Sequence, residues 1–237
     1  MNYARENVSC EASVSRGEIY ACGAFKNVYR GEYTSGVRAG EECVSKEFKS
    51  GSVYAASYFD SEMKIFEKTL EIINKFNRSG LINKNIWLNQ PAVWTYTQSQ
   101  AKCLVEPFIE NFEKFNSNSG WTPRESSNWI DVMQALSHFS YHTTNRHLVL
   151  CDLQGGVYKD GFIITDPVIM STTSKNHQEY GPTDLGYEGI STFFSNHVCS
   201  RFCHSDWMSP VKKVRYFPIQ QGTSMALTRN SRATLPY

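Results

Sequence analysis

The sequence contains no long hydrophobic run. None of its segments reaches the roughly 20 consecutive apolar residues that a membrane-spanning helix needs. Residues 1–7, MNYAREN, also lack the apolar stretch of a signal peptide. We therefore expect a soluble, cytoplasmic domain with no membrane segment.

The chain also lacks an excess of charge of either sign. Lysine and arginine number 24 and aspartate and glutamate 23, which gives a net charge of +1. A protein that binds duplex DNA needs a basic face to neutralise phosphates. The charge balance therefore argues against a nucleic-acid partner, and the partners have to be inferred from local sites.

A disulfide framework is equally absent. The seven cysteines are an odd number, and they are scattered along the chain at positions 10, 22, 43, 103, 151, 199 and 203. Small disulfide-rich domains have even numbers of cysteines at close, regular spacing. We expect most of these thiols to be reduced and buried.

The first half of the chain predicts a β-rich region with one main helix. Glycines divide residues 1–40 into short apolar stretches, as turns between antiparallel strands require. Residues 43–48 alternate in polarity, which places Val44 and Lys46 on the same face of a strand. Apolar residues recur at helical spacing over 58–76. Further strands are expected at 93–96 and 103–107, and the proline at 107 ends this region.

The second half predicts a buried helix and two strands that each end in an acid. The helix covers residues 129–139 and carries His138. Strands at 148–151 and 162–165 are followed by Asp152 and Asp166. We expect these two carboxylates to converge on one metal ion. After Met208 the chain is basic and irregular. A chain of 237 residues can therefore be bipartite, with lobes at 1–107 and 108–210 and a tail at 211–237.

The ionisable groups suit phosphoryl transfer. This chemistry needs a lysine on the nucleotide phosphates, oxygen ligands for magnesium and an acid near the attacking hydroxyl. Lys46, Glu62, Asp152, Gln154 and Asp166 supply these groups. Taken singly, a strand lysine is usually solvated, and an aspartate after a strand usually forms a turn. Only the set together indicates a phosphotransferase.

A second pattern, His-x-Cys-x-x-x-Cys, predicts a zinc site. His197, Cys199 and Cys203 place three zinc-type ligands within one turn and loop. A tetrahedral site needs a fourth ligand. The residues alone leave several contenders for this position, namely His138, His142, His204 and Cys151.

Together, these patterns resemble the catalytic domain of the alpha-kinase family. The motifs occur in family order over roughly residues 18–207. They are VSKEF at 44–48, VEP at 105–107, FSY at 139–141 after His138, DLQG at 152–155, TDP at 165–167, GPTDLG at 181–186 and HVCSRFC at 197–203. The resemblance implies an α+β fold of two lobes, protein-kinase-like and of the alpha-kinase type. The first lobe binds ATP, and the second holds the catalytic loops and a structural zinc site.

The resemblance also implies roles for single residues. Lys46 resembles the lysine that binds nucleotide phosphates, and Glu62 resembles the helix glutamate that forms an ion pair with that lysine. Glu106 lies where the hinge between the lobes meets adenine. Asp152 resembles the catalytic aspartate. Magnesium would be held by Gln154 and Asp166, and zinc by His138, His197, Cys199 and Cys203.

Two positions depart from the family pattern. Gly23 is followed by Lys26, where many members have a glycine and then an arginine close to the ATP phosphates. Lysine keeps the charge but loses the bidentate fork of arginine. In the glycine-rich loop, Asp184 replaces an asparagine that contacts nucleotide in some relatives, and a carboxylate there would repel phosphates unless it faced a cation.

The expected activity is transfer of the γ-phosphoryl group of Mg-ATP to a threonine or serine hydroxyl of a protein substrate. The departures at Lys26 and Asp184 leave an alternative open. In that alternative the chain is a pseudokinase, or a zinc-stabilised module that binds protein without catalysis. A more remote alternative is a metal-dependent phosphohydrolase, which would release free phosphate.

Overall fold

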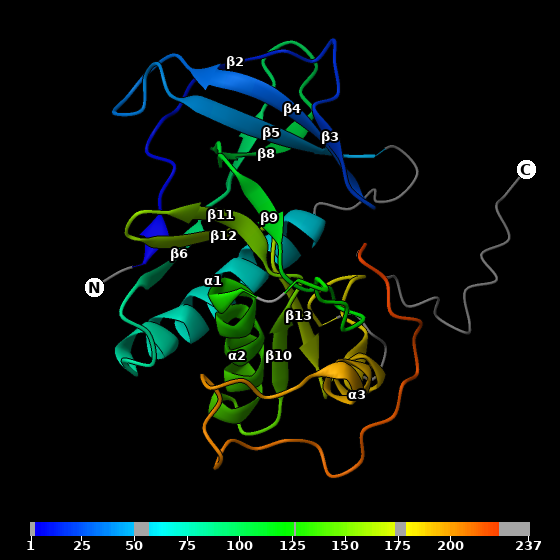
Figure 1. Cartoon of the computed structure of the whole chain (residues 1–237). Coiled ribbons are helices and arrows are strands. Elements are labelled where there is room, and N and C mark those ends of the chain that lie inside the picture. The colour runs from blue at the N-terminus through cyan, green and yellow to red at the C-terminus, as the bar shows by residue number, and fades with distance from the viewer. Residues whose placement is uncertain (1–2, 50–56, 126, 174–178, 223–237) are drawn as a thin grey trace, which may run out of the picture.

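The computed structural model describes residues 3–49, 57–125, 127–173 and 179–222. These residues form three sheets and three helices, arranged in layers (Figure 1). A six-stranded sheet lies at the top of the view and a five-stranded sheet beneath it. Helices α2 and α3 lie below them with a two-stranded sheet. None of the helices described combines the length and hydropathy needed to cross a bilayer.

The six-stranded sheet is antiparallel and is built from the first half of the chain. Its order is β2-β4-β5-β8-β7, with β3 paired to β4. The strands are β2 (Ala12–Val14), β3 (Ala21–Cys22), β4 (Lys26–Tyr33), β5 (Glu42–Phe48), β7 (Ala92–Thr95) and β8 (Lys102–Pro107). The register pairs Val28 with Lys46 and Lys26 with Phe48. Because side chains alternate along a strand, Lys26 and Lys46 share one face of this sheet.

The five-stranded sheet takes strands from both halves of the chain. Its order is β1-β6-β12-β11-β9. The strands are β1 (Ala4–Arg5), β6 (Asn85–Asn89), β9 (Phe112–Lys114), β11 (Gln154–Tyr158) and β12 (Gly161–Thr165). The division expected at Pro107 therefore does not separate the sheets. Strand β6 precedes Pro107 yet pairs in parallel with β12, which comes after it.

Two helices, the five-stranded sheet and a strand pair enclose the main core, and a third helix belongs to a second apolar cluster. Helix α1 (Ser57–Arg78) packs on β6 and on α2 (Asn128–Thr143). The apolar stripe of α1 buries Ile65, Phe66, Ile72, Ile73 and Phe76. Strands β10 (Leu148–Cys151) and β13 (Val168–Ser171) pair antiparallel, and α3 (Gly186–Asn196) packs on β13. Ser127 caps α2, since its hydroxyl accepts the N–H of Ile130 at 3.2 Å.

The local periodicity located several of these elements. The helices predicted at 58–76 and 129–139 are extended at their ends, and the five strands predicted by residue range are present with shifts of at most one residue at an end. The pattern gave no sign of β6, β9, β11, β13 or α3. Strand β11 contains two adjacent glycines, which favour turns, and α3 begins inside the loop predicted at 181–186.

Residues 204–222, which follow the zinc-type motif, form an irregular segment that we call the strap. Its backbone N–H groups donate to hydroxyls of α3 and of a buried loop. Val214 donates to Ser191 at 2.8 Å, Tyr216 to Thr192 at 2.9 Å and Gln220 to Ser119 at 2.9 Å. In Figure 1 this segment, drawn in orange and red, passes α3 and rises toward the sheets. The strap is therefore held by side-chain hydroxyls and not by a sheet.

Candidate active site

A cavity of about 600 Å³ brings many of the predicted site residues together. Its lining comes from the glycine-containing turn before β4, from α1, from the ends of β10 and β12, from the glycine-rich loop and from the end of the strap. Among the lining residues are Gly23, Lys26, Glu62, Lys114, Asp152, Gln154, Asp166, Thr183, Gln221 and Gly222. The two strand-end acids therefore line the same cavity, and their convergence on one metal ion stays a prediction.

Both acids adopt left-handed backbone conformations directly after their strands. Asp152 has a φ of 57° and Asp166 a φ of 52°. Aspartate tolerates this region better than most residues, at a cost of about 1–2 kcal/mol each. Gly155, three residues after Asp152, has a φ of 153°, and a Cβ there would lie 1.8 Å from the carbonyl oxygen of Ile163. Only glycine fits at this position, which explains the residue that follows Gln154.

The predicted ion pair between Lys46 and Glu62 is not formed, because Glu62 has a different lysine partner. Glu62 instead binds Lys26, with 2.7 Å between Nζ and Oε1, and the same ammonium lies 2.7 Å from Asp166 Oδ1. Lys26 therefore bridges α1 and the end of β12. Burial by itself lowers the pKa of Lys26, but the carboxylates of Asp166 and Glu62 outweigh burial and raise it. The lysine stays protonated between two acids.

Lys46 pairs with Glu106, and their Nζ and Oε1 atoms are 2.5 Å apart. The register explains this partner, because Lys46 lies opposite Leu104 on β8 and Glu106 is two residues further along on the same face. Thr165 donates to Glu106 at 2.7 Å and accepts from Lys46 at 3.2 Å. Lys46 also lies 4.0 Å from Asp166 Oδ2. The acids Asp166 and Glu106 raise the pKa of Lys46 against the lowering effect of burial.

Lys46 and Glu106 border a narrower space than the main cavity. They line a cavity of about 20 Å³ that shares Glu62 and Asp166 with the larger one. The hinge backbone expected to meet adenine has partners within the protein. Phe108 donates its N–H to the carbonyl of Glu42 at 3.0 Å, and the Pro107 carbonyl accepts from Asn89 at 2.8 Å. The backbone groups at 107–108 therefore hold the hinge together.

Lys114 is a site residue that sequence reasoning missed. It lies on β9, and its Nζ donates to Asp152 Oδ1 at 2.8 Å. Strand β9 pairs with β11 so that Lys114 is opposite Gln154, which brings the ammonium to Asp152. A single lysine in a three-residue strand carries no local signal. Only the sheet register places it beside an aspartate.

Asp184, at the position where some relatives have a nucleotide-contacting asparagine, does not line the cavity. Its side chain is fully buried, and Oδ1 accepts the N–H groups of Ser171 and Gly186, both at 2.9 Å. The carboxylate thus joins the glycine-rich loop to the end of β13. Burial raises its pKa. Residues 181–183 of the same loop line the cavity, and the Thr183 carbonyl accepts from Asn118 at 3.0 Å.

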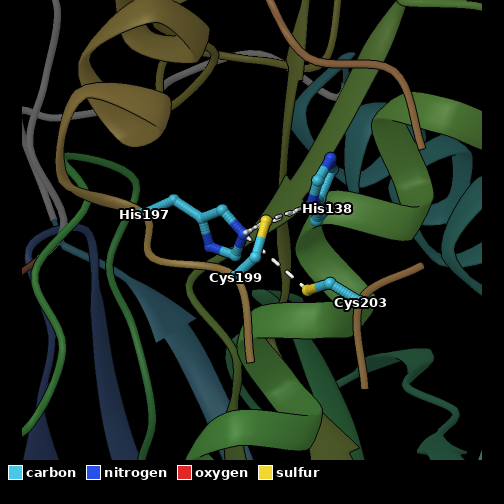
Figure 2. Close-up of side chains that lie close together, drawn as sticks. All are labelled: His138, His197, Cys199 and Cys203. Carbon is cyan, nitrogen blue, oxygen red and sulfur yellow. Dashed lines mark hydrogen bonds between the residues drawn. The ribbon is translucent and has the colours of Figure 1, made fainter. Parts of the chain in front are cut away.

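The four predicted zinc ligands cluster on the far side of α2 from the sheets. Figure 2 shows the side chain of His138, from α2, facing His197, Cys199 and Cys203, which follow α3. The four ligand atoms lie within 4.8 Å of one another. His197 Nε2 is 3.2 Å from His138 Nδ1 and 3.7 Å from Cys199 Sγ. Tetrahedral zinc bonds of about 2.0–2.3 Å put ligand atoms roughly 3.3–3.8 Å apart, so most of these spacings fit zinc.

The surroundings of His138 also suit a metal ligand. Its Nε2 lies 3.0 Å from the carbonyl oxygen of Met208. A carbonyl can only accept, so Nε2 carries the proton and Nδ1 presents its lone pair to the cluster. Burial, followed by the nearby His138, lowers the pKa of His197 to about 3. Burial also lowers the pKa of His138. Both shifts favour the neutral imidazole, which is the form that binds metals. His142 and His204, the other histidine contenders, lie against Trp207 instead.

The fold and the cavity define an α+β, protein-kinase-like domain. A family model described as alpha-kinase matches residues 21–203. The chain belongs to the alpha-kinase family, which confirms the resemblance seen in its motifs.

Curated relatives and solved structures agree with this assignment. The chain is 36% identical over 197 residues to alpha-protein kinase 1 of Dictyostelium discoideum, a match that covers 81% of this chain and 14% of the relative. It is 29% identical over 201 residues to myosin heavy chain kinase B of the same organism, covering 82% and 26%. The chain thus spans a minor part of these proteins. The alpha-kinase domain of myosin heavy chain kinase A in complex with AMP has the same fold, with a TM-score of 0.67, 23% identity and coverage of 81% and 88%.

Proposed function

We propose that this chain is an ATP-dependent protein kinase that transfers the γ-phosphoryl group of Mg-ATP to a threonine or serine hydroxyl of a protein. One observation carries the proposal. A single cavity is lined by Lys26, Asp152, Gln154 and Asp166, and Lys46 lies 4.0 Å from Asp166 at its edge. Phosphoryl transfer depends mainly on such positioning and charge neutralisation. Relatives named as protein kinases add support.

The two lysines and the oxygen donors have complementary roles in this proposal. Lys26 and Lys46 are positive at neutral pH and face the region where the phosphates of ATP would lie. Gln154 and Asp166 would hold magnesium, since an amide and a carboxylate oxygen suit a hard cation that keeps several waters. Bound magnesium would supply further neutralisation of phosphate charge.

Asp152 is the candidate group for orienting the acceptor hydroxyl. It is 2% exposed, which restricts its side chain to the cavity wall. Lys114 holds Oδ1 at 2.8 Å and so fixes the direction of the carboxylate. A carboxylate held in this way can align a substrate hydroxyl and accept its proton in the transition state. Lys114 and Asp152 therefore form the acid–base end of the proposed site.

The cluster of two histidines and two cysteines would hold a structural zinc ion. Four protein ligands leave no open coordination position, so this metal would take no part in the reaction. It would connect α2 to the segment after α3 and thereby fix the start of the strap. Because the ligands come together only in the folded chain, zinc binding would add to the stability of this lobe.

A transfer assay tests the proposal. The chain is incubated with labelled ATP, magnesium and either a basic protein or a mixed peptide library, and Asp152→Asn serves as the matched variant. We expect labelled phosphothreonine or phosphoserine with the parent chain, and at least a 100-fold lower rate with the variant. ATP binding without any phosphoprotein would overturn the proposal in favour of a pseudokinase. Free phosphate without phosphoprotein would indicate a phosphohydrolase.

A further inference from the structure

The loop between β9 and α2 forms backbone and side-chain hydrogen bonds with residues 152–153, the proposed catalytic loop. Phe115 donates its N–H to the carbonyl of Leu153 at 2.8 Å. The side-chain oxygen of Asn116 accepts the N–H of Leu153 at 2.9 Å. We propose that Asn116 is a positioning residue for Asp152. This inference rests on the proposed kinase function and assigns a role to a residue outside the cavity.

The backbone at Asp152 needs such support. Asp152 is left-handed, with a φ of 57°, and it lies with Leu153 between β10 and β11, outside the strand ladders. The N–H of Leu153 belongs to the peptide unit that leaves Asp152. An acceptor at a fixed place therefore sets the orientation of that peptide and, through it, the direction of the carboxylate. Strained conformations persist where surrounding contacts determine them in this way.

Asn116 is itself fixed in place. Its side chain is fully buried, and its amide nitrogen donates to Ser137 Oγ of α2 at 3.0 Å. Asparagine combines an acceptor and donors on one short side chain, so it can bind the loop with one end and the helix with the other. Helix α2, which packs in the core, thereby fixes the position of the catalytic loop. Lys114, two residues earlier, holds the carboxylate of the same aspartate.

The whole polar stretch around Asn116 is buried, although asparagine and serine are typical of exposed turns. Asn116, Ser117, Asn118 and Ser119 are each fully buried. Asn118 binds the glycine-rich loop through the Thr183 carbonyl, and Ser119 binds the strap at Gln220. Asn116 is the member of this stretch that reaches the catalytic loop. Its replacement should therefore affect the chemical step more than nucleotide binding.

The experiment compares Asn116→Ala with Ser137→Ala in the full chain. The two changes break the same Asn116–Ser137 bond, but only the first removes the acceptor for Leu153. We expect a larger loss of melting temperature for Asn116→Ala, which leaves the Leu153 N–H without its acceptor, than for Ser137→Ala. We also expect a fall of about tenfold or more in kcat for Asn116→Ala only, and ATP KM values within about twofold for both variants. The Leu153 amide, followed by hydrogen exchange, should lose protection in Asn116→Ala and keep it in Ser137→Ala.

A third variant, Asn116→Asp, keeps an oxygen for Leu153 and can accept from Ser137. It should retain Leu153 protection and a kcat within about threefold to fivefold of the parent value, and it carries the test if Asn116→Ala does not fold. Equal falls in kcat for Asn116→Ala and Ser137→Ala would overturn the inference, as would an unchanged kcat with lost Leu153 protection. A low kcat in Asn116→Asp with protection retained would also overturn it. If the parent chain transfers no phosphate, the kinase proposal fails, whereas amide exchange still reports on Asn116.

Discussion

The ammonium group of Lys26 lies 2.7 Å from Oδ1 of Asp166, although Lys26 begins a strand of one sheet and Asp166 follows a strand of another. The same Nζ atom is 2.7 Å from Oε1 of Glu62 on α1. One cation therefore connects the antiparallel sheet, the main helix and the end of β12. The lysine that departs from the family arginine has a defined place at the centre of the site.

Replacing Lys26 by methionine should destabilise the chain. The change leaves two partly buried carboxylates facing each other without their shared cation, and breaking such a pair costs about 3 kcal/mol of unfolding free energy. Urea denaturation at pH 7 measures this loss. Lys68→Met is the matched control, because Lys68 forms an exposed pair with Glu71 and should change stability by less than about 0.5 kcal/mol. Equal losses of unfolding free energy in the two variants would show that Lys26 stabilises the fold no more than an exposed lysine does.

Acidification should remove stability through Asp166. Burial by itself raises the pKa of this carboxyl, but Lys26 and Lys46 outweigh burial and hold the pKa well below its usual range. A lowered folded-state pKa adds stability above the unfolded value of about 3.9, and this contribution is lost as the pH falls below that value. Between pH 6 and pH 3 the parent chain should therefore lose more unfolding free energy than Asp166→Asn does. Parallel pH profiles would contradict the assignment.

Asp184→Asn should stabilise the chain at neutral pH. The second oxygen of Asp184, Oδ2, has no hydrogen-bond partner among the described residues, and burial raises the pKa. For an acid, a raised folded-state pKa means that stability falls as the pH rises above the unfolded value. Asparagine keeps an oxygen for Ser171 and Gly186 and removes the charge, with an expected gain of about 1 kcal/mol at pH 8.

Unfolding measured at pH 8, 6 and 4.5 checks this expectation for Asp184. The advantage of the variant should shrink as the pH falls, because the raised pKa makes the folded chain take up this proton before the unfolded chain does. The control is Asp160→Asn at an exposed turn, which should have little effect at any of these pH values. A loss of stability in Asp184→Asn at pH 8 would mean that the charge itself holds the glycine-rich loop.

Removal of zinc should lower the thermal stability of the C-terminal part of the domain. The purified chain is expected to contain one zinc ion, and a chelator should lower its melting temperature by about 10 °C or more, since metal binding contributes to folding energy. Cys203→Ser should reduce zinc content and melting temperature together. Cys10→Ser, at an exposed thiol outside the cluster, should change neither. A metal-free chain with unchanged stability would refute the zinc assignment.

The sequence alone was informative where chemistry depends on local pattern. Short apolar runs located the strands that precede Asp152 and Asp166, and both acids line one cavity, whereas their convergence on one metal ion stays a prediction. The zinc-type motif fixed three ligands, while the fourth came from the family resemblance. These features need only a few neighbouring residues, so they can be read without knowing the sheet order. The roles assigned to the site residues stay predictions until the assays are done.

The tertiary structure decided the partners of the charged groups. Glu62 pairs with Lys26 and Lys46 with Glu106, and Lys114 reaches Asp152, because strand register and sheet order bring distant residues to the same face. The burial of the polar residues 116–119 also depends on the tertiary structure, because α2, the catalytic loop, the glycine-rich loop and the strap pack around them. Side-chain periodicity gives the face of each strand, but the neighbour across the sheet is set only when the whole chain packs.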